Sequence, residues 1–209
     1  MTTRIAILAS GSGTIAQALL DASAAGQLGD GQVVVLISDR ADAIALGRAK
    51  SAGVEDLYVN PDDFSDRKAY SHALAEELVA REVTLVCLAG FMKILSPEFI
   101  RPFAGRILNT HAALLPSFIG AHPVRDTLAW GAKVTGATIH LVDEEVDHGP
   151  IVLQQAVDVE PNDDEASLTE RIKQVERQIF PAAVRLMLSG RLHMNGRVIR
   201  IQDNEGINA

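Results

Sequence analysis

The chain has 209 residues and a formal net charge of -8 at pH 7, and 47% of its residues are hydrophobic but only 4% aromatic. This size and composition suit one domain with an aliphatic core, as in buried parallel strands covered by helices. The acidic balance, without a basic patch or a membrane-length apolar run, argues against nucleic acid or membrane partners. The first residues lack the layout of a signal peptide, so we expect a cytoplasmic protein.

Strand and helix signals alternate along the first half of the chain. Short apolar runs predict strands over residues 4–9, 32–38, 57–59, 84–89 and 107–111. Apolar periodicity, caps and glycines predict helices from the first glycine loop toward Gly26, over 41–53, after Ser65, and from Ser96 to Gly105. Cys87, the only cysteine, lies within an apolar run, which indicates a core residue and excludes an intrachain disulfide.

The second half contains strand signals and one long helical stripe. The patterns predict a short helix at 124–130, strands at 134–142 and 151–159, a long helix that contains Pro181, a hairpin around Asn195-Gly196, and a flexible tail at 202–209. We therefore expect an α/β fold: a doubly wound, mostly parallel open sheet of Rossmann-like type, with a mixed edge. A long C-terminal helix and a small hairpin complete it.

The segment Gly11-Ser12-Gly13-Thr14-Ile15-Ala16 follows a predicted strand and begins a helix. Its backbone amides and the helix dipole can hold a phosphate. The segment also fits the glycine-x-glycine-x-x-alanine form of the dinucleotide fingerprint, in which Asp39 after the second strand would meet a ribose hydroxyl. A nicotinamide-dependent oxidoreductase is therefore one alternative, and a tight turn without a ligand is another.

Asn109 and His111 end the strand at 107–111, and their spacing places both side chains on one face of it. With Asp147 they could form an amide, imidazole and carboxylate set that stabilises a developing oxyanion. The simpler interpretation is that the first two satisfy local backbone groups and that Asp147 lies in a solvated acidic turn. His122 and His140 match no common zinc spacing, so we expect satisfied histidines and no metal.

Five ordered blocks of this sequence together resemble one family. They are Ser10-Gly-Ser-Gly-Thr14, Leu88-Ala-Gly-Phe-Met-Lys-Ile-Leu-Ser-Pro97, Ile107-Leu-Asn-Thr-His111, Leu114-Leu-Pro-Ser-Phe118 and Val146-Asp-His-Gly-Pro150. The family is phosphoribosylglycinamide formyltransferase, the folate-dependent enzyme of purine synthesis. The resemblance runs from about Arg4 to the terminal hairpin and is far more specific than any single motif.

The resemblance implies direct attack of the glycinamide amine on the formyl carbon of 10-formyltetrahydrofolate, a co-substrate, without a covalent enzyme intermediate. Asn109 and His111 match the positions that stabilise the tetrahedral oxyanion. Asp147 matches the position that pairs with the imidazole and helps order a proton-carrying water. Related hydrolases of formyltetrahydrofolate are the nearest alternative, although they usually carry an added amino-terminal domain.

The same resemblance implies the binding residues. The ribonucleotide would contact Gly11, Ser12, Gly13, Thr14, Arg67, Met92 and Glu176. The folate would contact Met92, Lys93, Ile94, Leu95, Val142, Asp143, Glu144, Val146 and Asp147. We expect one formyltransferase domain over 1–201, with a nucleotide-phosphate half at about 1–105 and a catalytic and folate half at about 106–201. Its partners would be these small molecules, and its state a monomer or homodimer.

The sequence departs from the family pattern at three positions. Ile15 stands where an asparagine is usual, and Ala112 and Ile119 replace two prolines. Because Ile15 removes a polar side chain beside the phosphate loop, and because the lost prolines loosen the segment after His111, weaker substrate binding is the expected effect. None of the three removes a predicted catalytic group.

Overall fold

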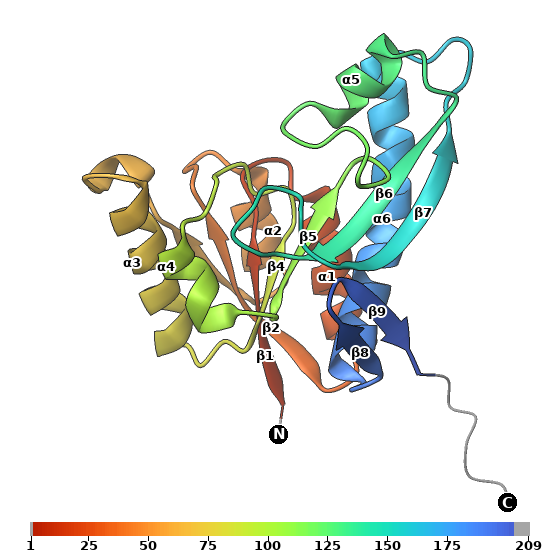
Figure 1. The fold of residues 1–209 in the computed structure, drawn as a ribbon. Helices are drawn as coiled ribbons and strands as arrows, with labels where there is room; N and C mark the ends of the chain where they lie inside the picture. The colour runs from red at the N-terminus through yellow and green to blue at the C-terminus, as the bar shows by residue number, and fades with distance from the viewer. Residues whose placement is uncertain (1, 203–209) are drawn as a thin grey trace, which may run out of the picture.

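Seven strands form one sheet in the computed structural model, which describes residues 2–202 (Figure 1). Their order is β3-β2-β1-β4-β5-β6-β7. Neighbours from β3 to β5 pair in parallel, whereas β6 is antiparallel to both β5 and β7. The strands are β1 (Thr3–Leu8), β2 (Gly31–Ser38), β3 (Glu55–Tyr58), β4 (Leu85–Leu88), β5 (Ile107–His111), β6 (Val134–Leu141) and β7 (Ile151–Asp158). The predicted sheet with a mixed edge is confirmed.

Helices cover both faces of the sheet, as the alternating pattern predicts (Figure 1). One apolar cluster lies between the sheet and α1, α2 and α6, and a second lies under α3 and α4. The helices are α1 (Thr14–Ala24), α2 (Ile44–Ser51), α3 (Arg67–Ala80), α4 (Pro97–Ile100), α5 (Pro123–Ala129) and α6 (Glu165–Leu188), with 3-10 turns η1 (Pro61–Asp63) and η2 (Arg101–Phe103). The fold is therefore doubly wound.

The long helix α6 begins at a reciprocal cap. The Asp164 carboxylate accepts a hydrogen bond from the Ser167 backbone N–H, and the Ser167 hydroxyl accepts one from the Asp164 N–H. The helix continues through Pro181 and buries an apolar stripe against the sheet. It thereby brings the polar residues on its inner face close to β5.

Two helix ends differ from the sequence prediction. The cap of α3 is Asp66, whose carboxylate accepts a hydrogen bond from the Ala69 N–H, rather than the adjacent Ser65. The helix that begins at Pro97 ends as an α-helix at Ile100 and continues as the turn η2. Pro102 explains the second difference, because it has no backbone N–H with which to extend the α-helical pattern.

The chain ends in the predicted hairpin, formed by β8 (Leu192–Asn195) and β9 (Val198–Ile201). Leu192 and Ile199 pack against the apolar cluster under α1 and α6, which attaches the hairpin to the domain. Residues 203–209 of the predicted tail lie outside the described residues. Within residues 2–202, none of the helices combines the length and apolar character needed to cross a membrane.

Candidate active site

Two polar side chains lie on one face of β5, where the alternation of the strand predicts them. Asn109 and His111 face β6 and the loop that follows it, while Thr110 between them faces α6. An open α/β sheet binds its ligands beyond the carboxyl ends of its parallel strands, which is where these two residues lie. The amide and the imidazole therefore lie together at this end of the sheet.

His140 of β6 lies opposite Asn109 across the antiparallel edge of the sheet. Asn109 Nδ2 is 3.0 Å from His140 Nε2, and His140 Nδ1 is 2.9 Å from the Leu141 carbonyl oxygen. Because Nδ2 can only donate, His140 is neutral and carries its proton on Nδ1. Burial, the largest cause, lowers the pKa of His140, which agrees with this neutral state. His140 thus fixes the orientation of the Asn109 amide and leaves its second N–H free to donate to a ligand.

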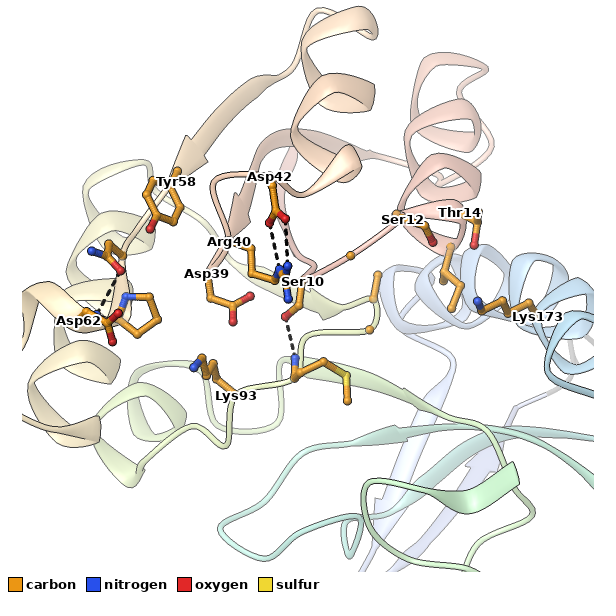
Figure 2. A pocket seen from close by; sticks show the side chains of 18 residues that line it. Ser10, Ser12, Thr14, Asp39, Arg40, Asp42, Tyr58, Asp62, Lys93 and Lys173 are labelled. Carbon is orange, nitrogen blue, oxygen red and sulfur yellow. Dashed lines mark hydrogen bonds and ion pairs between the residues drawn. The ribbon is translucent and has the colours of Figure 1, made fainter. Parts of the chain in front are cut away.

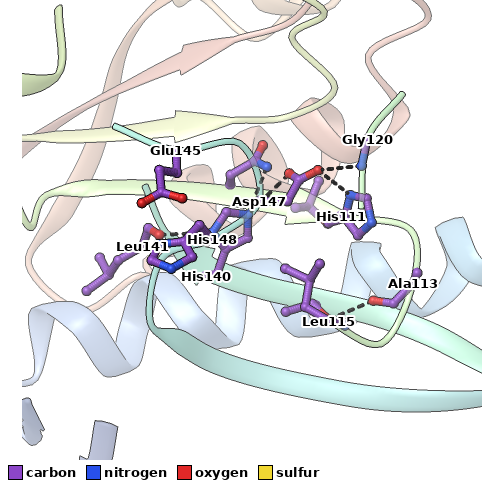
Figure 3. Close-up of polar contacts among 12 residues, drawn as sticks. His111, Ala113, Leu115, Gly120, His140, Leu141, Glu145, Asp147 and His148 are labelled. Carbon is purple, nitrogen blue, oxygen red and sulfur yellow. Dashed lines mark hydrogen bonds and ion pairs between the residues drawn. The ribbon is translucent and has the colours of Figure 1, made fainter. Parts of the chain in front are cut away.

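Asp147 joins these groups from the loop after β6, as Figure 3 shows. Its Oδ2 lies 3.4 Å from His111 Nδ1 and accepts a hydrogen bond of 3.0 Å from the Gly120 N–H, and its Oδ1 lies 3.8 Å from His140 Nε2. The two paired side chains are only 6% and 11% exposed, so water screens their attraction little. Asp147 has a φ of 51°, a left-handed conformation that aspartate tolerates well.

The other ring nitrogen of His111 also faces an oxygen atom. Nε2 lies 2.9 Å from the Phe118 carbonyl oxygen, which belongs to the loop between β5 and α5. An imidazolium with both nitrogens protonated would satisfy the Asp147 carboxylate and this carbonyl together. A ligand oxygen that displaced the Phe118 carbonyl would therefore lie within hydrogen-bond distance of this ring nitrogen.

The loop that carries Asp147 is tied to the C-terminal hairpin. The Asp143 carboxylate accepts from His148 Nδ1 at 2.8 Å, and the Arg197 Nη1 lies 2.7 Å from His148 Nε2. Arg197 also donates to the His148 carbonyl oxygen. The His148 ring thus lies between the Asp143 carboxylate and the Arg197 guanidinium. The hairpin turn therefore contacts and stabilises the loop next to Asp147.

A cavity of about 720 Å³ lies beyond β1, β2 and β4 (Figure 2). The predicted loop residues Gly11, Ser12, Gly13 and Thr14 and the predicted Met92 line it, together with Lys173 of α6. Gly13 has a φ of 67°, and a Cβ there would lie 2.7 Å from the Ala45 Cα, so only glycine fits. Backbone amides at the start of α1 and the Lys173 ammonium make this end of the cavity suitable for a phosphate.

Comparison with known proteins identifies the family. The model of the formyl transferase family matches residues 3–184. The phosphoribosylglycinamide formyltransferase of Mycobacterium tuberculosis is 45% identical over 93% of this chain and 89% of its own length. The chain belongs to this family. The crystal structure of glycinamide ribonucleotide transformylase 1 from Symbiobacterium toebii is 47% identical, with a TM-score of 0.95 over 97% of this chain and 95% of that one.

Longer proteins contain a segment that is similar to this chain. The trifunctional purine biosynthetic protein adenosine-3 of Drosophila melanogaster is 43% identical over 90% of this chain. The chain spans only 14% of the length of that relative. The family resemblance that the sequence blocks indicate is nevertheless confirmed, because the bacterial relatives match over nearly their whole length.

In this formyltransferase, Glu176 lies on the inner face of α6, three residues after Lys173. It is 4% exposed, and its Oε1 accepts a hydrogen bond of 2.6 Å from the Thr110 hydroxyl of β5. Burial raises the pKa of Glu176, and the Thr110 hydrogen bond opposes that shift. Sequence reasoning from the residues alone missed Lys173, although a lysine one helical turn before Glu176 is the signal that could have indicated it.

The residues expected on the folate side come from two segments that the formyltransferase fold places together. Leu95, after β4, and Val142, after β6, pack in the same apolar cluster. The Arg101 side chain of η2 lies 3.6 Å from the Glu144 carboxylate, which joins the two segments at the surface. The predicted apolar residues Met92, Ile94 and Val146 are exposed, by 65%, 57% and 49%. Lys93 lines the cavity of Figure 2.

The assignment of Arg67 to the ribonucleotide phosphate, which the resemblance implies, remains a prediction. Arg67 is the first residue of α3, its side chain is exposed, and it is not among the residues that line the space beside the glycine loop. Of the departures from the family pattern, Ile15 is 7% exposed and forms part of the cavity wall, whereas Ile119 is 53% exposed. Residues 2–202 contain no cluster of three or more histidine, cysteine or acidic side chains arranged to hold a metal ion.

Proposed function

We propose that this enzyme transfers the formyl group of 10-formyltetrahydrofolate to the amine of 5-phosphoribosylglycinamide in purine synthesis. The names of the relatives support the acceptor, and the cluster of Asn109, His111 and Asp147 supports the chemistry. The observation that carries the proposal is the buried pair of Asp147 and His111 beside an amide whose orientation is fixed. Such a pair stabilises negative charge on an oxygen atom.

The proposed reaction has two stages. The amine nitrogen forms a bond to the formyl carbon, and the carbonyl electron pair moves to the oxygen to give a tetrahedral oxyanion. The oxyanion then collapses, the bond from that carbon to N10 of the folate breaks, and N10 receives a proton. The amine loses a proton, so no net proton is consumed. In this proposal a water ordered by Asp147 carries the proton between the two nitrogens.

The oxyanion would receive two hydrogen bonds. One comes from the second N–H of Asn109, and the other comes from His111 Nε2 when the oxyanion replaces the Phe118 carbonyl oxygen as its acceptor. The Asp147 carboxylate, 3.4 Å from His111 Nδ1, would orient the imidazole and stabilise positive charge that develops on it. Loss of one donor of this kind typically costs about 3 kcal/mol of barrier, or about 10² to 10³ in rate.

The cavity supports a binding mode for the ribonucleotide. Its phosphate would lie on the amides of the loop from Gly11 to Thr14, with the Lys173 ammonium beside it. Glu176, on the same face of α6, would accept hydrogen bonds from the ribose hydroxyls. From there the glycinamide amine would reach toward Asn109 and His111. Arg67, which begins α3 with an exposed side chain and which the family resemblance assigns to the phosphate, would supply a second cation.

The folate would bind on the other side of the catalytic cluster. Its pterin would lie between the segment around Leu95 and the loop from Val142 to Asp147, which meet in one apolar cluster. The exposed side chains of Ile94 and Val146 would cover the apolar part of the co-substrate. This location places N10 and its formyl group next to the imidazole of His111.

Release of tetrahydrofolate, followed spectrophotometrically with and without glycinamide ribonucleotide, tests this function. We expect release only when the amine is present. Release at the same rate without the amine would identify a hydrolase instead. If no release occurs under either condition, the proposed donor is wrong.

A further inference from the structure

The large cavity has a second arm that the proposed reaction does not use. From the glycine loop it extends past the carboxyl end of β2 to the segment after β3, and its wall includes Asp39, Arg40, Tyr58 and Asn60 (Figure 2). In the sheet, β2 and β5 lie on opposite sides of β1. A ribonucleotide that runs from the glycine loop toward β5 therefore leaves this arm empty.

Asp39 is the unusual residue of the second arm. It is only 8% exposed, and its Oδ1 is buried without a hydrogen-bond partner among residues 2–202. The adjacent Arg40 does not pair with it, because its guanidinium makes two hydrogen bonds, of 3.0 and 2.9 Å, to the Asp42 carboxylate. Figure 2 shows the Asp39 carboxylate directed into the cavity. A buried carboxylate without a partner is costly, so it indicates a binding role.

A second unsatisfied group lies near Asp39. The Tyr70 hydroxyl of α3 is buried and has no hydrogen-bond partner within the described chain. Burial, and then the negative charge of Asp39, raises the pKa of Tyr70, so the phenol keeps its proton at neutral pH. A buried hydrogen-bond acceptor in the wall of this arm and a buried donor near it are thus both unsatisfied among the described residues. This combination suits a ligand with hydroxyl groups, which can donate and accept at once.

The position of Asp39 narrows the class of ligand. In nucleotide-binding folds of this type, an acidic residue after the second strand accepts hydrogen bonds from the ribose hydroxyls of a nucleotide whose phosphate lies on the glycine loop. Here Gly11 and Gly13 directly precede α1, and Asp39 directly follows β2. Tyr58 at the end of β3 lines the same arm and is 41% exposed, so its ring can pack against a base.

We infer that the second arm binds a ribonucleoside 5′-phosphate, with its phosphate on the glycine loop, its ribose diol on Asp39 and its base against Tyr58. Because the loop can hold one phosphate at a time, this nucleotide and the glycinamide ribonucleotide exclude each other. The competition rests on the proposed function, but the binding of the nucleotide does not. The ligand would therefore act as a competitive inhibitor of the formyl acceptor.

The test is calorimetric titration of the whole chain with adenosine 5′-phosphate, 2′-deoxyadenosine 5′-phosphate and inorganic phosphate. We expect the ribonucleotide to bind at least tenfold more tightly than either comparator. Asp39→Asn should remove that preference and leave phosphate binding unchanged. Asp62→Asn is the matched control: it makes the same change in the same cavity, but the Asp62 side chain is exposed, so it should alter affinity by less than about twofold.

Three results would overturn the inference: no binding of the ribonucleotide beyond that of phosphate, equal binding of the ribo and deoxy forms, or an unchanged preference in Asp39→Asn. The comparison of the two sugars uses the unaltered chain, so it decides the question even if the variant does not fold. Failure of the proposed function would show itself separately, as loss of formyl transfer while nucleotide binding persists. Binding without competition against glycinamide ribonucleotide would refute the shared glycine loop.

Discussion

Replacement of Asp147 by asparagine removes one charge from the catalytic cluster and almost nothing else. Asparagine has the same shape and also tolerates the left-handed backbone conformation, with a φ of 51°, that this position requires. Its amide oxygen can still accept the hydrogen bond from the Gly120 N–H. The variant should therefore fold normally, and any loss of activity would report on the charge beside His111.

The expected magnitude follows from the geometry of the pair. At 3.4 Å, with an effective dielectric constant of about 20, the attraction between Asp147 and a charged His111 is at most about 5 kcal/mol. Loss of one oxyanion donor typically costs about 3 kcal/mol. We therefore expect turnover to fall by about 10² to 10³, because the imidazole loses the carboxylate that stabilises charge on it in the transition state.

Single-turnover formyl transfer and titration with glycinamide ribonucleotide measure the two effects separately. We expect the substitution to slow the chemical step and to change the affinity for the nucleotide by less than about threefold. Glu145→Gln is the control, since it makes the same kind of change in the same loop at an exposed carboxylate. A loss of nucleotide affinity as large as the loss of turnover, or turnover reduced less than tenfold, would refute the assigned role of Asp147.

Two further predictions concern residues that support the cluster. His140→Leu removes the acceptor of the Asn109 amide and should lower kcat about tenfold with little change in KM. His140→Gln should retain more activity than His140→Leu. Equal kcat values for the two variants would argue against a positioning role. Arg197→Gln removes the contacts to His148, which are largely exposed, so we expect the KM for the formyl folate to rise by at most about fivefold at constant kcat. An unchanged KM would show that the hairpin does not support the loop.

The sequence was sufficient for features that depend on local pattern. Strand alternation placed Asn109 and His111 on one face of β5, and the glycine loop predicted a cavity at the start of α1. Asp147, which is distant in the sequence, was assigned to the same site from the resemblance, because the sequence blocks of the family occur here in the same order. These predictions rest on the regular geometry of the backbone and on complete motifs. Both can be recognised in a single sequence.

Contacts between distant segments could not be predicted in the same way. The pairing of Asn109 with His140 depends on the register of β5 and β6, which no local pattern specifies. Lys173 reaches the glycine loop only because α6 packs across α1, and Arg197 reaches His148 only because the hairpin folds back on the domain. The role of Arg67, assigned by resemblance alone, remains a prediction, because no local pattern in the sequence indicates it.

The most direct test of direct formyl transfer follows a labelled formyl group from 10-formyltetrahydrofolate in a rapid-quench experiment with glycinamide ribonucleotide. The proposal predicts that the label appears in the formylated ribonucleotide at the rate of tetrahydrofolate release, with none in free formate and none attached to the protein. Label in formate would indicate hydrolysis, and label held by the protein before product forms would contradict direct attack by the amine.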